Sequence, residues 1–131
     1  MWTIDAHTQL TGVLGYPVRH SLSPAMHNAA LQSLGLNGVY LAFEVPPNAL
    51  PNAIAGMRGL HIQGLNLTIP HKQAVIPLLD GTTDAAQQVG AVNTLFWDDD
   101  QLIGDNTDAE GFLRGLREAG VEPASQTVLI L

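Results

Sequence analysis

Segments with the apolar period of a β-strand alternate with segments of helical period along this 131-residue chain. Strands are expected over residues 11–15, 40–45, 62–68, 91–97 and 101–105, the last two as a hairpin. Helices are expected over 23–34, 50–57, 83–89 and 108–119, with a short one after Pro70. Residues 127–131 form an apolar run (TVLIL), which is typical of a strand buried on both faces of a parallel sheet. This order predicts an α/β fold, a three-layer sandwich in which helices flank a mostly parallel sheet.

The first expected helix has a start signal in the sequence. Ser23 is a good N-cap residue and Pro24 suits the first helical position. At helical spacing, Met26, Ala30 and Leu34 should form the apolar face that packs on the sheet.

The last expected helix carries the pattern of a capping box. Thr107 would be the cap and Glu110 would occupy the third helical position. Phe112, Leu116 and Ala119 should then form its buried face.

Composition excludes several classes of function. The formal net charge is −7 with only five Lys and Arg, so there is no basic stripe for binding nucleic acid. No apolar run approaches the roughly 20 residues that span a bilayer, and the N-terminal residues lack the pattern of a secretory signal. The absence of cysteine rules out disulfides and thiolate chemistry and favours a cytoplasmic location.

Metal and nucleophile chemistry find no support either. The five histidines include no i,i+4 pair, so no zinc site is expected. The Asp98–Asp100 run lacks the glycine of a calcium loop and is interpreted as a solvated turn. The chain also contains no Gly-x-Ser-x-Gly nucleophile motif.

Two polar stretches follow expected strands, at the place where ligands bind in α/β folds. In Ser21-Leu-Ser-Pro, two hydroxyls lie at a helix N-terminus, a site suited to a carboxylate, although Ser23 could be only a cap. In the stretch from Asn66 to Lys72, Asn66 and Thr68 share one strand face. Lys72 falls in a first helical turn, where the helix dipole opposes a cation, and it could still be an ordinary surface lysine.

Two further polar stretches flank the expected hairpin. Gly90-Ala-Val-Asn-Thr places Asn93 just before a strand, where it could serve only a turn. Asp105-Asn-Thr-Asp places Asp108 in the first turn of a helix, where it could merely complement the helix dipole.

In their order and spacing, these four stretches together resemble the shikimate dehydrogenases, within the shikimate/quinate dehydrogenase family, over the N-terminal substrate-binding domain. The resemblance runs from about Thr11 to the end of the chain. It implies an enzyme that uses NADP to reduce 3-dehydroshikimate reversibly to shikimate, on the route to aromatic amino acids. One difference is leucine at positions 65 and 67, where the family more often has valine; both side chains should point away from the polar strand face.

The resemblance also assigns roles to the polar residues. It implies that these side chains bind the substrate: Ser21, Ser23, Asn66, Thr68, Lys72, Asn93 and Asp108. The two serines would bind the carboxylate, and the asparagines, Thr68 and Asp108 would hold ring hydroxyls. Lys72 and Asp108 would form the catalytic pair, because a lysine ammonium can give a proton to a developing alkoxide and stabilise its charge.

The family's cofactor site has no counterpart in this sequence. In the family, a strand like 127–131 leads into a Gly-rich turn that holds the cofactor pyrophosphate, and that turn is absent here. Residues 1–109 are therefore expected to form the substrate-binding catalytic domain. Residues 110–131 are expected to be a linker helix and the first strand of a truncated dinucleotide-binding (Rossmann) domain, whose missing part would bind NADP. An unpaired apolar strand at 127–131 is expected to promote self-association.

Two alternatives stay open. One is a quinate/shikimate dehydrogenase, although quinate-preferring relatives tend to alter one serine of the Ser-x-Ser pair and both serines are present here. The other is a non-catalytic domain that senses shikimate or quinate, for which Lys72 and Asp108 would be unnecessary.

Overall fold

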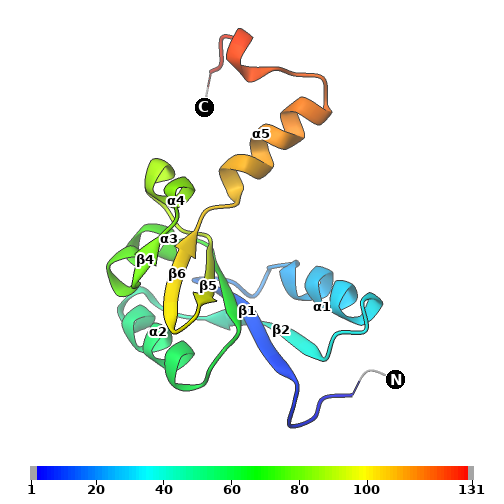
Figure 1. Ribbon diagram of the computed structural model, residues 1–131, viewed down its shortest axis with the longest axis vertical. Coiled ribbons are helices and arrows are strands. Elements are labelled where there is room, and N and C mark those ends of the chain that lie inside the picture. Colours follow the sequence, from blue (N-terminus) through cyan, green and yellow to red (C-terminus); the bar gives the residue numbers. More distant parts are fainter. Residues whose placement is uncertain (1–2, 130–131) are drawn as a thin grey trace.

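The computed structural model describes residues 3–129 (Figure 1). One sheet joins the strands of the described chain: β1 (Gln9–Gly15), β2 (Gly38–Glu44), β3 (Gly64–Leu67), β4 (Gly81–Thr82), β5 (Thr94–Asp98) and β6 (Gln101–Asp105). The helices are α1 (Ser23–Ser33), α2 (Leu50–Gly59), α3 (His71–Ala74), α4 (Asp84–Val89) and α5 (Asp108–Glu118). None of these helices is long and apolar enough to cross a membrane.

The sheet has the order β2-β1-β3-β5-β6-β4. Three of its five strand pairs are parallel, and the β5–β6 hairpin supplies the antiparallel ones. The predicted α/β fold with a mostly parallel sheet flanked by helices is therefore confirmed.

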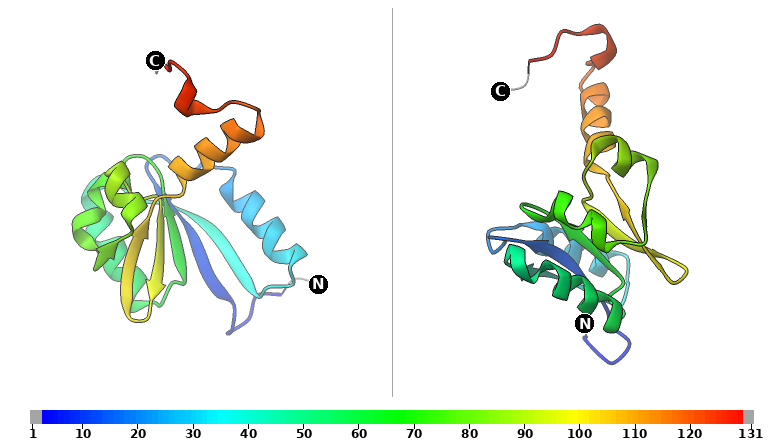
Figure 2. Two further views of the ribbon diagram at one scale, coloured as in Figure 1. Left: turned by 45° about the horizontal axis from the view of Figure 1, so that its top comes forward. Right: turned by 90° about the vertical axis from the view of Figure 1, so that its left-hand side faces the viewer.

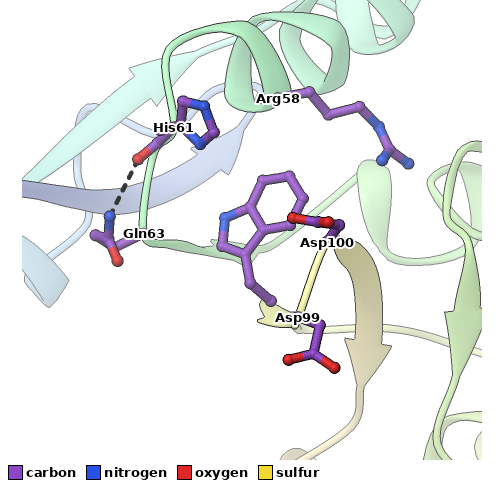
Figure 3. A pocket seen from close by; sticks show the side chains of 6 residues that line it. Arg58, His61, Gln63, Asp99 and Asp100 are labelled. Atoms are coloured by element: carbon purple, nitrogen blue, oxygen red, sulfur yellow. Dashed lines mark hydrogen bonds between the residues drawn. The ribbon is translucent and has the colours of Figure 1, made fainter.

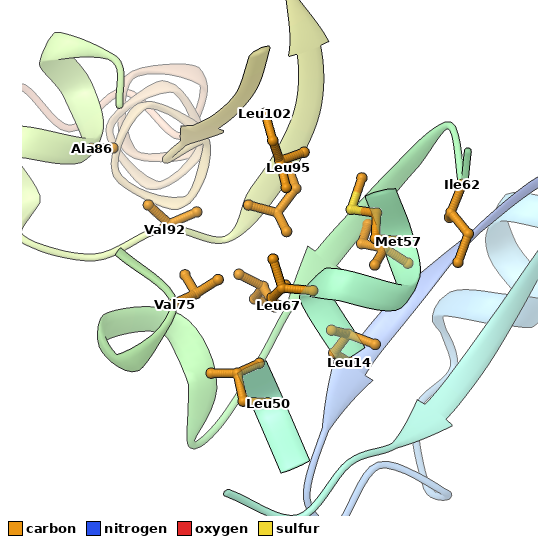
Figure 4. Packing of buried hydrophobic residues seen from close by; sticks show 12 residues of the cluster. Leu14, Leu50, Met57, Ile62, Leu67, Val75, Ala86, Val92, Leu95 and Leu102 are labelled. Atoms are coloured by element: carbon orange, nitrogen blue, oxygen red, sulfur yellow. The ribbon is translucent and has the colours of Figure 1, made fainter. Parts of the chain in front are cut away.

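Helices cover both faces of the sheet. Helix α1 packs on one face, where Leu31 contacts a small buried cluster of Val13, Val18 and Tyr40. Helices α2 and α4, and Val75 just after α3, contribute to the larger cluster on the other face (Figure 4). That cluster contains Leu14, Leu50, Ile54, Met57, Ile62, Leu65, Leu67, Val75, Ala86, Val92, Leu95 and Leu102. The neighbours Val13 and Leu14 point to opposite faces, so β1 is buried on both sides, as expected for a central parallel strand.

The predicted apolar face of α1 is wrong. Met26 and Leu34 are 62% and 70% exposed, and Leu31 is the apolar residue that packs inward. The inward face also carries polar residues, because the Asn28 side chain bonds the backbone of β2. The predicted cap differs too: the N-cap position is Leu22, and Ser23 is already the first helical residue.

The predicted capping box of α5 is also wrong. Thr107 is at the N-cap, but its side chain makes no capping bond. The cap is instead Asn106, whose Oδ1 accepts hydrogen bonds from the backbone N–H groups of Asp108 and Ala109 at 3.1 and 3.2 Å. No residue of α5 is buried, and Phe112 is 68% exposed, because the helix extends away from the sheet (Figures 1 and 2).

The strand predicted at 127–131 is absent where the structure describes it. Residues 127–129 are in no strand, and Ile130 and Leu131 lie outside the described residues. A strand requires a neighbouring strand for its backbone hydrogen bonds, and no described segment pairs with residues 127–129.

Candidate active site

The four polar stretches converge at one edge of the sheet. Strands β3 and β6 run in the same direction because each is antiparallel to β5, which lies between them. The ends of β3 and β6 therefore lie beside the start of β5, and the register aligns Asn66 with Thr94 and Thr94 with Asp105. Lys72 follows β3, Asn93 precedes β5 and Asp108 follows β6.

Lys72 and Asp108 form a direct ion pair at this edge. The Lys72 Nζ lies 2.6 Å from Oδ2 of Asp108. The Asp108 Oδ1 accepts a second bond, at 2.8 Å, from the Asn93 side-chain amide. The Lys72 and Asp108 side chains are 34% and 55% exposed, so both can reach a ligand. The expected conflict between Lys72 and a helix dipole does not arise, because α3 has only four residues and Lys72 lies in its last turn as well as its first.

Asn93 connects the β5 strand to the start of α5. Its Oδ1 accepts from the Thr94 hydroxyl at 2.9 Å and from the Thr107 backbone N–H at 3.0 Å. Its Nδ2 donates to the Thr107 hydroxyl, at 2.9 Å, as well as to Asp108. Only 8% of the Asn93 surface is exposed, so Asn93 is a buried residue that links β5 to α5 by hydrogen bonds and not a simple turn residue.

Asn66 joins the same network from β3. Its Oδ1 accepts from the Tyr40 hydroxyl at 2.7 Å, and its Nδ2 lies 3.2 Å from both the Asn93 carbonyl and Thr94 Oγ1. On β3 the half-buried Asn66 alternates with Leu65 and Leu67, which are buried in the core, as predicted.

Ser21, Ser23 and Thr68 form a second group, around a cavity of about 300 Å³ that Tyr16 and His20 also line. This volume is at the lower end of the range for small-molecule sites, roughly 300–1,000 Å³. The Ser21 Oγ accepts from the Ser23 backbone N–H at 3.2 Å, which leaves the Ser21 hydroxyl proton available to a ligand.

The two groups are adjacent, although of the predicted residues only Ser21, Ser23 and Thr68 line this cavity. Thr68 precedes α3, and its carbonyl accepts the backbone N–H of His71 at 2.9 Å, immediately before Lys72. Close packing fixes Thr68, because a Cβ atom at Gly15 would lie only 2.5 Å from its methyl carbon.

Another cavity, of about 410 Å³, lies at the opposite end of the sheet, near the β5–β6 turn (Figure 3). Trp97, Asp99 and Asp100 are among the residues that line it, and none of the predicted site residues does. Among the described residues there is no group of His, Cys, Asp and Glu that could hold a metal ion.

Several supporting residues were not predicted. Tyr40, Thr94 and Thr107 bond directly to the predicted asparagines, and Asn106 caps α5. Thr94, Asn106 and Thr107 lie within the polar stretches, so their neighbours in sequence could have indicated them. Tyr40 lies in an apolar strand with no local signal.

An α/β fold that gathers polar side chains at one edge of its sheet defines a small-molecule-binding domain, and the ammonium–carboxylate pair equips this one for proton transfer. A family model described as the shikimate dehydrogenase substrate binding domain matches residues 13–95, well over half of the chain. The chain belongs to this family.

Relatives and solved structures agree with that membership. The chain is 51% identical to the NADP(+) shikimate dehydrogenase of Moorella thermoacetica, over all of the chain and 44% of the relative. It matches shikimate 5-dehydrogenase of Listeria monocytogenes, solved in complex with shikimate and NAD, with TM-score 0.87 and 46% identity over 91% of the chain and 41% of that protein. The chain thus spans less than half the length of these relatives.

The same fold also occurs in a protein named for a different substrate. A solved 5-ketofructose reductase of Gluconobacter sp. strain CHM43, in its ligand-free form, matches with TM-score 0.82 and 33% identity. That match covers 87% of this chain and 41% of the reductase.

Proposed function

We propose that the complete protein carrying this chain catalyses the reversible NADP-dependent reduction of 3-dehydroshikimate to shikimate, a step of aromatic amino acid and chorismate biosynthesis. In this proposal the chain supplies the substrate site and the catalytic pair. The observation that carries it is the 2.6 Å contact between Lys72 and Asp108, braced by Asn93, in a member of this family.

Lys72 is the proposed proton donor to the substrate oxygen. Reduction of a ketone generates an alkoxide that needs a proton, and an ammonium group supplies both the proton and charge stabilisation. One Nζ proton points to Asp108, which leaves two for a ligand. In the oxidative direction the proton of the reacting hydroxyl returns to the Lys72 nitrogen, while Asp108 orients Lys72 and accepts a hydrogen bond from a substrate hydroxyl.

The remaining residues are proposed to orient the substrate. Ser21 and Ser23 would bind its carboxylate with hydroxyl and helix N-terminal donors, and Asn66 and Thr68 would bind its ring hydroxyls. Asn93 would also bind a ring hydroxyl, by exchanging one of its hydrogen bonds within the protein for one to the substrate. Neutral donors suit an acidic chain of net charge −7, because they recognise an anionic polyol without a basic surface.

The hydride comes from the nicotinamide cofactor, and the described residues do not fit a dinucleotide site. The glycine-rich turn of a dinucleotide site joins the end of a strand to the start of a helix. In this chain the glycines with positive φ (Gly35, Gly90 and Gly120) each follow the end of a helix instead. We therefore assign NADP to a part of the protein beyond this chain. Residues 1–109 would be the substrate-binding catalytic domain, and residues 110–131 a linker to the dinucleotide-binding domain. The absence of cysteine favours a cytoplasmic location.

The competing functions differ in substrate or in turnover. Quinate is a related ring acid, and the 5-ketofructose reductase indicates that this fold also serves a keto sugar. A non-catalytic sensor would bind shikimate without using the Lys72–Asp108 pair.

The test is reduction of NADP by the complete protein with shikimate, quinate or the reduced form of 5-ketofructose as substrate. We expect kcat/KM to be highest for shikimate. A higher value for another substrate would reassign the substrate, and tight shikimate binding without turnover would support the sensor.

A further inference from the structure

The side-chain hydrogen bonds of the site have a defined direction. The Asn93 backbone carbonyl can only accept, so the atom of Asn66 that lies 3.2 Å from it must be the amide nitrogen. The Asn66 oxygen therefore faces the Tyr40 hydroxyl, 2.7 Å away, and Tyr40 must be the donor.

The same direction continues to the carboxylate. Asn66 donates to Thr94, Thr94 donates to Oδ1 of Asn93, and Asn93 donates to Oδ1 of Asp108. Hydrogen bonds in such a chain polarise one another, and bonds that end on an ionised group are the strong ones. Tyr40 is the first donor of this chain.

Tyr40 is itself held rigidly. Its backbone N–H and carbonyl both bond the Asn28 side chain at 2.8 Å, and its ring stacks on His27 with centroids 4.1 Å apart. Only 4% of its surface is exposed. Burial raises the pKa of Tyr40 to about 12, so the hydroxyl remains a donor at neutral pH.

We propose that Tyr40 is a positioning residue, whose hydroxyl orients the Asn66 amide and, through Thr94, holds Asn93 beside Asp108. Both Nδ2 protons of Asn66 are used within the protein. Asn66 therefore offers a ligand only its oxygen, which accepts from a ring hydroxyl and cannot bind the reacting ketone. This inference rests on the proposed function for its substrate and on the hydrogen bonds for its geometry.

The kinetic test uses the complete protein and a double-mutant cycle. Tyr40→Phe keeps the buried ring and should lower kcat/KM for shikimate about three- to tenfold, the effect of one neutral hydrogen bond. Because Tyr40 acts through Asn66, the double variant Tyr40→Phe/Asn66→Ala should be no worse than Asn66→Ala alone. The control is Thr11→Val, which removes a hydroxyl from the residue paired with Tyr40 in the sheet; among residues 3–129 this hydroxyl donates to the Val39 carbonyl alone. Its kcat/KM should stay unchanged.

A second measurement needs no substrate. The Asn66 side-chain NH₂ signals of the complete protein, identified by their loss in Asn66→Ala, should shift in Tyr40→Phe and stay in place in Thr11→Val. Unchanged Asn66 signals in Tyr40→Phe would overturn the positioning role. So would a double variant whose kcat/KM falls by the product of the two single-variant factors. If the complete protein does not oxidise shikimate but its Asn66 signals shift in Tyr40→Phe, the proposed function is refuted and the role of Tyr40 is supported.

Discussion

At the scale of single residues, the candidate site is built around one carboxylate with two donors of different kinds. Asp108 accepts from the Lys72 ammonium through one oxygen and from the neutral Asn93 amide through the other. An exposed ion pair contributes only about 0–1 kcal/mol to stability. Substitutions of this pair therefore test the chemistry of the site more than the folding of the domain.

Lys72→Ala in the complete protein should lower kcat for shikimate oxidation by about 10²–10⁴, the usual contribution of a positioned acid or base. The change in KM should be smaller, because other residues bind the ring. Asp108→Asn should lower kcat similarly and raise KM more, because the carboxylate also receives a substrate hydroxyl. Steady-state kinetics measure both, with Arg114→Ala on the exposed side of α5 as the control. Near-normal turnover of Lys72→Ala would remove Lys72 from the mechanism.

Sequence alone predicted the proximity of Lys72, Asn93 and Asp108 only through the family resemblance, because they lie up to 36 positions apart. Tyr40 could not be predicted. Its role depends on the register of β1 with β2 and β3, which brings its hydroxyl over Asn66, and a strand sequence does not encode its neighbours.

At the scale of elements, the type of each helix and strand before residue 120 was predictable except for the two-residue strand β4, whereas helix caps and faces were not. The period of apolar residues identifies an element, but tertiary contacts decide which side chains are free to cap it. Thr107 occupies the cap position of the capping-box pattern, yet its hydroxyl is bound by Asn93, 14 positions away. Asn106 then takes the capping role and also donates to the Ala91 carbonyl at 2.9 Å.

Asn106→Ala should therefore destabilise residues 1–131 by about 0.5–2 kcal/mol, the usual loss for a helix cap. Glu110→Ala should change the free energy of unfolding little, because Glu110 makes no capping bond in the structure. Urea unfolding followed by circular dichroism measures both variants. A larger decrease in the free energy of unfolding for Glu110→Ala than for Asn106→Ala would support the capping box instead.

Asp80 should make stability depend on pH. It accepts from Arg58 of α2 at 2.8 Å and from the Leu102 backbone of β6 at 2.7 Å. The Arg58 hydrogen bond, followed by that of Leu102, lowers the pKa of Asp80 below its ordinary value. A lowered folded pKa stabilises the fold above the unfolded carboxyl pKa of about 4, and this stabilisation is lost as pH falls through the folded value.

Asp80→Asn should accordingly lower the urea midpoint at neutral pH, and the difference from the unmodified chain should shrink below about pH 4. Asp99→Asn, which removes a charge from the exposed hairpin turn, is the control and should leave the midpoint unchanged at both pH values. A constant difference between Asp80→Asn and the unmodified chain at all pH values would show that the charge of Asp80 is irrelevant.

At the scale of the whole molecule, the α/β class followed from the alternation of periods, but the state of the last segment did not. The run at 127–131 has strand composition, yet strand formation depends on a partner that local sequence does not supply. Val128 and Leu129 are 64% and 79% exposed, and Phe112 on α5 is 68% exposed. Phe112 belongs to α5, and Val128 and Leu129 to the segment after it; α5 and this segment extend away from the sheet (Figure 2).

Residues 1–131 alone should therefore self-associate through this segment. Burying an apolar side chain such as Val128 or Leu129 contributes about 1.5–3 kcal/mol, and an unpaired apolar segment can add a strand to another chain. Analytical ultracentrifugation should show concentration-dependent oligomers for 1–131 and monomers for 1–124. The matched control is Leu129→Asp in residues 1–131. It should also sediment as a monomer, because it places a charge in the contact without shortening the chain. If 1–124 forms oligomers, the contact involves Phe112 and α5 instead. If both lengths are monomers, the association is refuted.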